Sequence, residues 1–161
     1  MSEPLLVIDT NVVLDFLYFD DPASRPLRQA LEAGRVRAAV TPATLAEWLH
    51  VLAYPQFGLD AGAQRRLADR YRSLCTVFES VAVQAMPHKG TPTRYRLKPM
   101  QDRMPRCKDG DDQKFLDLAA QLGAPLVSKD RAVLKLRRLC APRFAILTPD
   151  EVPAWLSTVC G

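Results

Sequence analysis

The sequence predicts an α/β fold in which helices cover both faces of a parallel sheet. Short apolar, partly β-branched runs alternate with stretches of helical spacing along most of the chain. Strands that alternate with helices in this way are typical of a parallel sheet. The chain has 161 residues, the usual size of one domain and enough to bury a core. We therefore expect a single domain over residues 1–161.

Four short apolar runs are the predicted strands. They are Leu5 to Ile8, Val36 to Val40, Pro125 to Val127, and Phe144 to Leu147. Each run is too short to be a helix of ordinary length, and helical spacing follows the first three of them.

Three helices are predicted from their apolar stripes and their end signals. One has Thr41 as its N-cap and Pro42 as its first residue, and it ends before Pro55. A second starts at Asp60, and Gly123 ends the third. The side chains expected to face inward are Leu45, Trp48, Leu49 and Leu52 in the first helix, Leu67, Tyr71, Leu74 and Phe78 in the second, and Phe115, Leu116, Ala119 and Leu122 in the third.

The composition excludes several classes of protein. Hydrophobic residues make up 48% and charged residues 25%, which is typical of a globular protein rather than a disordered or membrane protein. The early apolar run is too short for a signal peptide or a spanning helix, so we expect a cytoplasmic protein without a membrane partner. The four cysteines lack C-x-x-C spacing and only two histidines accompany them, which argues against a zinc site or a disulfide framework.

The net charge of +4 arises from one segment. Residues 89–108 contain seven basic residues and one acid, so they carry +6, while the remaining 15 basic and 17 acidic residues sum to −2. Prolines and glycines interrupt residues 83–109, which predicts a long irregular connection. The basic residues are Lys89, Arg94, Arg96, Lys98, Arg103, Arg106 and Lys108.

Three interpretations of this basic segment remain open: a solvated loop, a clamp for RNA phosphates, or a surface that docks a partner. Clustered lysine and arginine supply the sequence-independent part of nucleic-acid affinity. Tyr95 among them could stack on an unpaired base. The candidate RNA contacts are Arg94, Arg96, Lys98, Arg103 and Arg106.

Acidic residues follow the predicted strands or open a predicted helix. Asp9 follows the first strand, Asp130 the third, and Asp111 and Asp112 open the third helix. In parallel sheets, ligand sites form at the carboxyl ends of the strands. Each aspartate could instead stabilise a helix as an N-cap, by about 0.5–2 kcal/mol. Capping does not explain Glu47, which lies inside a helix beside its apolar stripe.

A convergence of these acids would require a cation. Two carboxylates about 4 Å apart repel each other by roughly 4 kcal/mol at an effective dielectric constant near 20. Oxygen ligands without histidine or cysteine favour Mg²⁺ or Mn²⁺ over zinc. Such ions keep bound waters and accept phosphate oxygens, which predicts phosphodiester hydrolysis.

Five motifs in this order resemble the PIN-domain ribonucleases, and among them the VapC-like toxins of bacterial toxin–antitoxin pairs. They are Asp9 to Val13 after the first strand; Glu47 to Phe57, similar to the family's E-L-x-x-V-L-x-x-P-K-F; Cys107 to Leu116, similar to C-R-D-P-D-D-D-K-F-L; Leu126 to Asp130, similar to L-V-T-x-D; and Ile146 to Glu151, similar to I-L-T-P-x-E-F. Gly110 and Gln113 depart from the family pattern, in place of a proline and an acid.

The resemblance implies a three-layer α/β/α sandwich and an acidic site that holds one or two Mg²⁺ or Mn²⁺ ions. Asp9, Asp112 and Asp130 match the metal ligands, and Glu47 matches the acid that binds a second ion or orients water. Asp112 is preferred over its neighbours because it shares a helical face with Phe115, Leu116 and Ala119. The matched supporting groups are Thr10, Asn11, Asp109 and Ser128. Asp111 is expected to be an N-cap or solvated, His50 an ordinary partly exposed side chain, and Trp48 part of the core.

The predicted function is metal-dependent endoribonuclease activity, with RNA as substrate, an antitoxin protein as partner and homo-oligomerisation as the resemblance implies. One alternative is a non-catalytic module of the same fold that binds nucleic acid or a partner. Another is a phosphatase of the haloacid-dehalogenase type, whose D-x-D loop resembles residues 9–11. Asn11 stands in place of the second aspartate of that loop.

Overall fold

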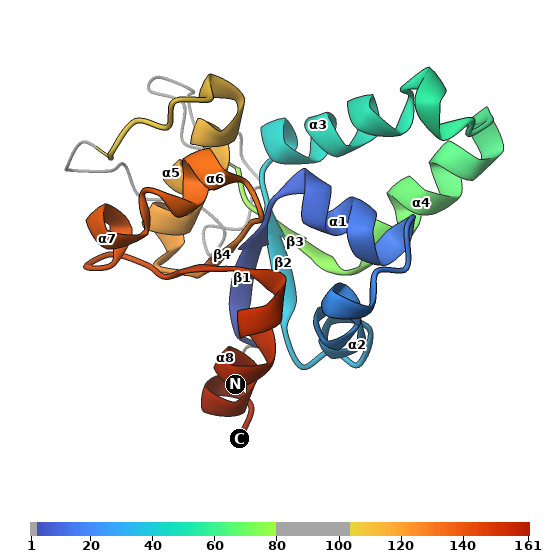
Figure 1. The fold of residues 1–161 in the computed structure, drawn as a ribbon. Coiled ribbons are helices and arrows are strands. Elements are labelled where there is room, and N and C mark those ends of the chain that lie inside the picture. The colour runs from blue at the N-terminus through green and yellow to red at the C-terminus, as the bar shows by residue number, and fades with distance from the viewer. Residues whose placement is uncertain (1–2, 80–103) are drawn as a thin grey trace, which may run out of the picture.

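The computed structural model describes residues 3–79 and 104–161, which form a central sheet of five parallel strands (Figure 1). The strand order is β3-β2-β1-β4-β5, and each neighbouring pair runs parallel. The chain builds the sheet outward from β1 in one direction and then resumes on the other side of β1. The strands are β1 (Leu5–Ile8), β2 (Arg37–Val40), β3 (Cys75–Val77), β4 (Leu126–Val127) and β5 (Ile146–Leu147).

The two faces of the sheet contribute to two separate cores. Leu6 and Ile8 of β1 belong to one core, whereas Val7 belongs to the other. Because side chains alternate across a strand, one apolar run can supply both cores. This explains why the strands are continuously apolar rather than alternating in polarity.

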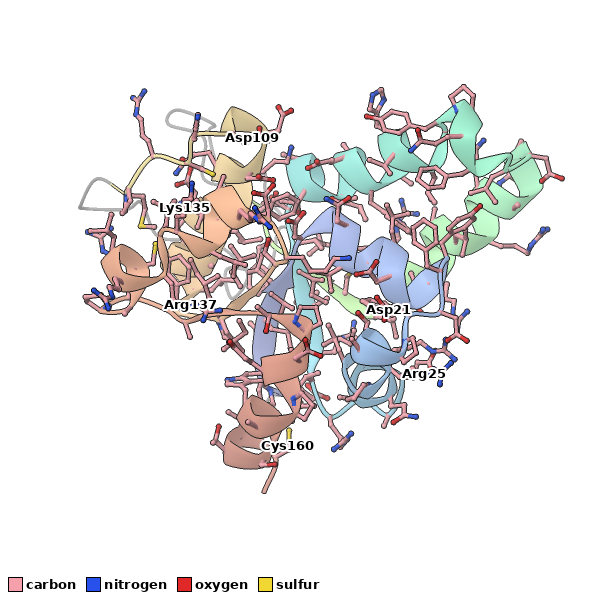
Figure 2. The ribbon with its side chains drawn as sticks, in the orientation of Figure 1. Asp21, Arg25, Asp109, Lys135, Arg137 and Cys160 are labelled. Atoms are coloured by element: carbon pink, nitrogen blue, oxygen red, sulfur yellow. The ribbon has the colours of Figure 1, made fainter. Side chains whose placement is uncertain are left out.

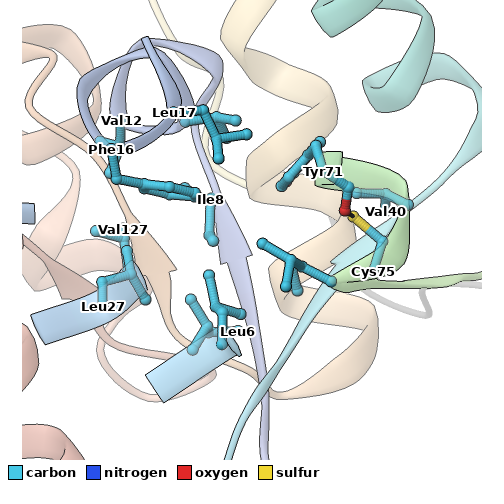
Figure 3. Packing of buried hydrophobic residues seen from close by; sticks show 14 of the residues in the cluster. Leu6, Ile8, Val12, Phe16, Leu17, Leu27, Val40, Tyr71, Cys75 and Val127 are labelled. Atoms are coloured by element: carbon cyan, nitrogen blue, oxygen red, sulfur yellow. Dashed lines mark hydrogen bonds between the residues drawn. The ribbon is translucent and has the colours of Figure 1, made fainter. Parts of the chain in front are cut away.

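Five helices contribute to the first core (Figures 1 and 3). Phe16, Leu27 and Trp48 are among its largest buried side chains, each at most 1% exposed. Trp48 packs edge to face against Tyr71, with ring centroids 5.7 Å apart. The helices are α1 (Thr10–Leu17), α2 (Arg25–Glu32), α3 (Pro42–Leu52), α4 (Ala61–Ser73) and α8 (Val152–Val159).

Three helices form the opposite layer, on the left of the sheet in Figure 1. They are α5 (Gln113–Leu122), α6 (Arg131–Leu134) and α7 (Arg137–Cys140). Phe115, Leu116 and Ala119 of α5 are buried against this face of the sheet, as their spacing predicts. The predicted three-layer α/β/α architecture is thereby confirmed. The described residues also form short 3-10 turns, which are η1 (Pro22–Ser24), η2 (Pro55–Phe57), η4 (Gly110–Asp112) and η5 (Pro149–Glu151).

The helix ends agree with the predicted signals. Thr41 caps α3 by accepting a hydrogen bond from the backbone N–H of Thr44 at 3.2 Å, and the Thr44 hydroxyl accepts from the N–H of Thr41 at 2.9 Å. Asp60 caps α4 in the same manner, through the N–H of Ala63. Gly123 ends α5 with φ at +63°, a left-handed conformation that glycine adopts without steric cost.

One element differs from its prediction. The second helix does not continue to Phe78 but ends at Ser73, and residues 75–77 form strand β3. The backbone N–H of Phe78 donates to the carbonyl of Val40 at 2.7 Å, so the chain there pairs with β2. The side chains of Tyr71, Leu74 and Phe78 are all buried, and their helical spacing is accidental beyond Leu74.

Two further sequence expectations have clear outcomes. Leu49 was expected to face inward, but its side chain is 39% exposed, whereas Trp48 and Leu52 of the same stripe are buried. All four cysteines have free thiols, in agreement with the expected lack of a disulfide framework. None of the helices within residues 3–79 and 104–161 combines the length and the apolar character needed to span a bilayer.

Candidate metal centre

The acidic residues gather at the carboxyl edge of the sheet, between β1 and β4. Asp9 directly follows β1, and its backbone N–H donates to the carbonyl of Val127 at 3.0 Å. Ser128 and Asp130 follow β4. Since the sheet grows in opposite directions from β1, the loops after β1 and β4 leave on opposite sides. Such a switch point is where open parallel sheets bind ligands.

Asp9 is a buried carboxylate at the N-terminus of α1, with 4% of its surface exposed. Its Oδ2 accepts a hydrogen bond from the Ser128 hydroxyl at 2.8 Å. Burial raises the pKa of Asp9, while the bonds from Ser128 and the backbone N–H of Asn11 oppose that shift. The negative charges of Glu47 and Asp130 raise the pKa of Asp9 further.

Ser128 connects Asp9 to Asp130. Its hydroxyl donates to Asp9 and accepts from the backbone N–H of Asp130 at 3.1 Å. Ser128 is fully buried, so this relay holds the turn after β4 in one arrangement. Asp130 in turn uses Oδ1 to accept from the N–H of Ala132 at 2.7 Å and caps α6. Asp130 thus performs the capping role considered from the sequence and also faces the acidic site.

Asp109 precedes η4 and is labelled in Figure 2, and Asp112 is the last residue of η4, directly before α5. Ligand oxygens of Asp109, Asp112 and Asp130 all lie within 4.8 Å of one another. Asp109 is exposed, Asp112 is buried and Asp130 is intermediate. Asp109 also caps η4 by accepting from the N–H of Asp111 at 3.1 Å, and Asp111 points to solvent. The closest triad therefore includes Asp109, whereas Asp9 lies beside it.

Asp112 is the most perturbed of these acids. Burial, followed by the charges of Asp9, Asp130 and Asp109, raises the pKa of Asp112 to about 7. Its Oδ2 is buried and has no hydrogen-bond partner within the described part of the chain. A buried acceptor without a partner is costly, and nearby carboxylates increase that cost. The position therefore favours a bound proton or a cation.

Glu47 belongs to the site through α3, but it already has a cationic partner. Its Oε2 lies 2.7 Å from Nζ of Lys114, which follows Asp112 by two residues on α5. Both side chains are half-buried, at 24% and 31% exposure. Lys114 was not among the predicted site residues, because the pair depends on how α3 packs against α5 and no local sequence pattern indicates that packing.

A second ion pair near the acidic residues, between Asp15 and Lys129, was also not predicted from the sequence. Oδ2 of Asp15 on α1 lies 2.5 Å from Nζ of Lys129, the residue between Ser128 and Asp130. The Asp15 side chain is only 9% exposed. Asp15 follows Asp9 by six residues and is the one polar residue in the apolar stretch 12–17 of α1, which was the available signal.

The other residues singled out lie around the centre in different ways. Thr10 is buried at the first position of α1, while Asn11 is exposed and approaches Asp9 through its backbone. His50 is exposed and contacts the Tyr54 ring edge to face, and Trp48 is part of the core, both as expected.

Most of the basic segment lies outside the described residues. Arg94, Arg96, Lys98 and Arg103, and with them Tyr95, fall within residues 80–103. Arg106 is described and exposed, as is Lys108. Lys108 directly precedes Asp109 and Arg106 lies three residues before it, so the end of the basic segment adjoins the acidic site.

The donor set fits a hard divalent cation. It consists of carboxylate oxygens, with neither histidine nor thiol among the clustered ligands. Mg²⁺ and Mn²⁺ prefer such oxygen ligands, and a cation would relieve both the repulsion at Asp112 and its unpaired buried oxygen. Aspartates 109, 112 and 130 could hold the ion, with Asp9 beside them.

Comparison with known proteins agrees with this architecture. The family model of the PIN domain matches residues 5–132, so the chain belongs to the PIN-domain family. The family that the motifs indicated is thereby confirmed.

Among solved structures, the chain is similar to one in the crystal structure of VapBC2 from Rickettsia felis bound to a DNA fragment from their promoter. The TM-score is 0.53 at 12% sequence identity, over 89% of this chain and 98% of that chain. The two chains are thus similar in fold. A search of curated protein sequences finds no significant match.

Proposed function

We propose that this PIN-domain protein is a metal-dependent endoribonuclease that hydrolyses RNA phosphodiester bonds. The environment of Asp112 is the main support for this proposal. Its carboxylate is buried beside three other aspartates, one of its oxygens has no hydrogen-bond partner among the described residues, and its pKa is raised to about 7. A module that only binds nucleic acid has no physical reason to keep carboxylates together, because they repel each other and repel phosphates.

The ligands in this proposal are Asp9, Asp112 and Asp130, with Asp109 as a further acid of the same group. Once free of its ion pair with Lys114, Glu47 would hold a second ion or orient the attacking water. When bound at these carboxylates, Mg²⁺ or Mn²⁺ would lower the pKa of a coordinated water and stabilise negative charge on the phosphate oxygens. Ser128 keeps the Asp9 carboxylate oriented by its hydrogen bond, and through the N–H of Asp130 it sets the distance between the two acids.

Protonation of Asp112 competes with this function. Because the pKa of Asp112 is raised to about 7, its carboxyl binds a proton over much of the mildly acidic range. Ligation of a cation requires the ionised form, so metal affinity should rise with pH until Asp112 is ionised. Activity is therefore expected above neutral pH rather than below it.

The biological role that fits this activity is that of a toxin in a toxin–antitoxin pair, acting in the cytoplasm. The similarity to a chain of the VapBC2 complex supports this role. An antitoxin protein is then the expected partner, and self-association into a homo-oligomer is expected as well. The basic segment that ends at Lys108 would hold the RNA backbone beside the acids.

The test is cleavage of a labelled RNA by the purified protein with Mg²⁺ or Mn²⁺, and with a chelator in their place. Asp9→Asn and Asp130→Asn should abolish cleavage while the fold persists in metal-free buffer, because each substitution removes repulsion. Asp69→Asn is the matched control, since Asp69 is exposed on α4 away from the acids. Undiminished cleavage by the Asp9→Asn, Asp130→Asn double variant would refute the mechanism.

The alternative of a non-catalytic binding module has its own signature in the same experiment. It predicts RNA binding that is independent of Mn²⁺, without cleavage, and no heat of Mn²⁺ binding at millimolar metal. The proposed nuclease instead binds Mn²⁺ and loses that binding in Asp112→Asn.

A further inference from the structure

The Lys114–Glu47 ion pair joins α3 to α5 at a lysine two residues after Asp112. Nζ of Lys114 lies 2.7 Å from Oε2 of Glu47. That oxygen is buried, and within the described residues it makes no hydrogen bond of good geometry, so the ammonium group is its principal compensation. Lys114 also lies 5.7 Å from the centroid of the Phe115 ring, which helps to hold its aliphatic chain in place.

The charges around the centre are strongly unbalanced. Asp9, Asp112 and Asp130 are coupled to one another electrostatically, and Glu47 also acts on Asp9. The second lysine nearby, Lys129, is paired with Asp15 instead. Lys114 is therefore the cation that the described residues place against a carboxylate of this site.

We infer that Lys114 is a positioning residue that withholds Glu47 from the metal, so that the aspartates alone bind the ion in the free protein. This inference rests on the proposed metal-dependent function and assigns Lys114 a part in it. Oε2 of Glu47 cannot bind the Lys114 ammonium group and a divalent ion equally strongly at the same time. The ion pair thus weakens metal binding and keeps the Glu47 carboxylate against Lys114.

Loss of Lys114 should increase metal affinity, which is not what loss of a purely structural residue would do. Loss of a lysine that had only a structural role would leave metal affinity unchanged or reduce it. Loss of Lys114 should instead release Glu47 and tighten Mn²⁺ binding by roughly threefold to tenfold, because one more carboxylate becomes available and one repelling charge is gone. Arginine in its place should preserve the pair and the original affinity.

The experiment measures Mn²⁺ affinity by titration calorimetry for the full-length chain and its variants Lys114→Met, Lys114→Arg and Lys135→Met. Lys135 is the matched control because it is exposed after α6 and has no ion pair within the described residues. We expect tighter binding in Lys114→Met, and unchanged binding in Lys114→Arg and Lys135→Met. Circular dichroism and thermal unfolding establish that each variant is folded, and Lys114→Gln provides a second neutral side chain.

A double-variant comparison separates the role of Glu47 from a general charge effect. In a Glu47→Gln background, the further change Lys114→Met should alter Mn²⁺ affinity by less than about twofold. A full increase in that background would show that Lys114 acts on the aspartates by its charge alone, and would overturn the inference. Unchanged or weaker binding in Lys114→Met would also overturn it. Lack of Mn²⁺ binding by the unaltered protein would refute the proposed metal site itself, and with it this inference.

Discussion

The carboxylate of Asp15 and the ammonium group of Lys129 form an ion pair that joins α1 to the turn after β4. Oδ2 and Nζ lie 2.5 Å apart, and Asp15 is the more deeply buried partner at 9% exposure. Lys129 stands between Ser128 and Asp130, so the pair also restrains the backbone that places both residues. It is therefore part of what preorganises the acidic centre.

Replacement of Lys129 should destabilise the protein. Lys129→Met leaves the buried Asp15 carboxylate without its cation, and we expect a loss of about 1–3 kcal/mol, below the cost for a fully buried pair because Lys129 is half-exposed. Urea unfolding measures the change. Asp15→Asn combined with Lys129→Met should recover part of the loss, and Lys135→Met should cost little. A loss of equal size in Lys135→Met would argue against the pair.

Stability of the metal-free protein should decrease as pH rises. The pKa of Asp112 is 3.8 in an unperturbed chain and about 7 in the folded protein, so the folded state binds the proton more tightly. The resulting stabilisation is complete below pH 3.8 and is lost as pH rises through about 7. Urea unfolding at pH 5 and pH 8 in the presence of a chelator should show this decrease. Asp112→Asn should reduce the difference between the two pH values.

Mn²⁺ should reverse that loss at pH 8. An ion that binds only the folded state stabilises it by about 2.7 kcal/mol at one hundred times its dissociation constant. Thermal unfolding should therefore shift to higher temperature with Mn²⁺ in the unaltered protein and in Asp69→Asn. The shift should vanish in Asp112→Asn, and an equal shift in that variant would place the ion elsewhere.

Ser128→Ala should affect both the fold and the centre. It removes the donor to Asp9 and the acceptor of the Asp130 N–H, both in a fully buried position, at a cost of about 1–3 kcal/mol. The pKa of Asp9 should rise further, because the hydrogen bond that favours its charged form is lost. Carbon-13 NMR of the aspartate carboxyl groups would follow that pKa. Ser157→Ala is the control because Ser157 is exposed on α8, and similar stability losses in both variants would contradict the assigned role.

Neutralisation of the basic segment should weaken RNA binding without changing metal affinity. Substitution of Arg94, Arg96, Arg103 and Arg106 by glutamine removes four positive charges, so the dependence of RNA affinity on salt should become less steep. Fluorescence anisotropy over a series of salt concentrations measures this slope, and calorimetry measures Mn²⁺ affinity. An unaltered slope would indicate that the segment is a solvated loop.

Much of the fold follows from local sequence patterns. The run from Leu5 to Ile8 is short, apolar and followed by Asp9, and it forms the central strand with the acid at its carboxyl end. Thr41, Pro42 and Gly123 lie at the helix ends they were expected to mark, because capping depends on neighbours in the chain. The strand β3 was missed because Leu74 and Phe78, which flank it, continue the helical spacing of α4.

The sequence by itself determined the alternation of strands and helices, the PIN-domain motifs and the acids that end at one edge of the sheet. Only the tertiary structure decided which of those acids approach most closely, with Asp109 joining Asp112 and Asp130. It also decided that Glu47 is paired with Lys114 and Asp15 with Lys129. The physical reason is that periodicity and capping act over a few residues, whereas these contacts join side chains from different elements whose distances are set by packing of the whole sheet and its helices.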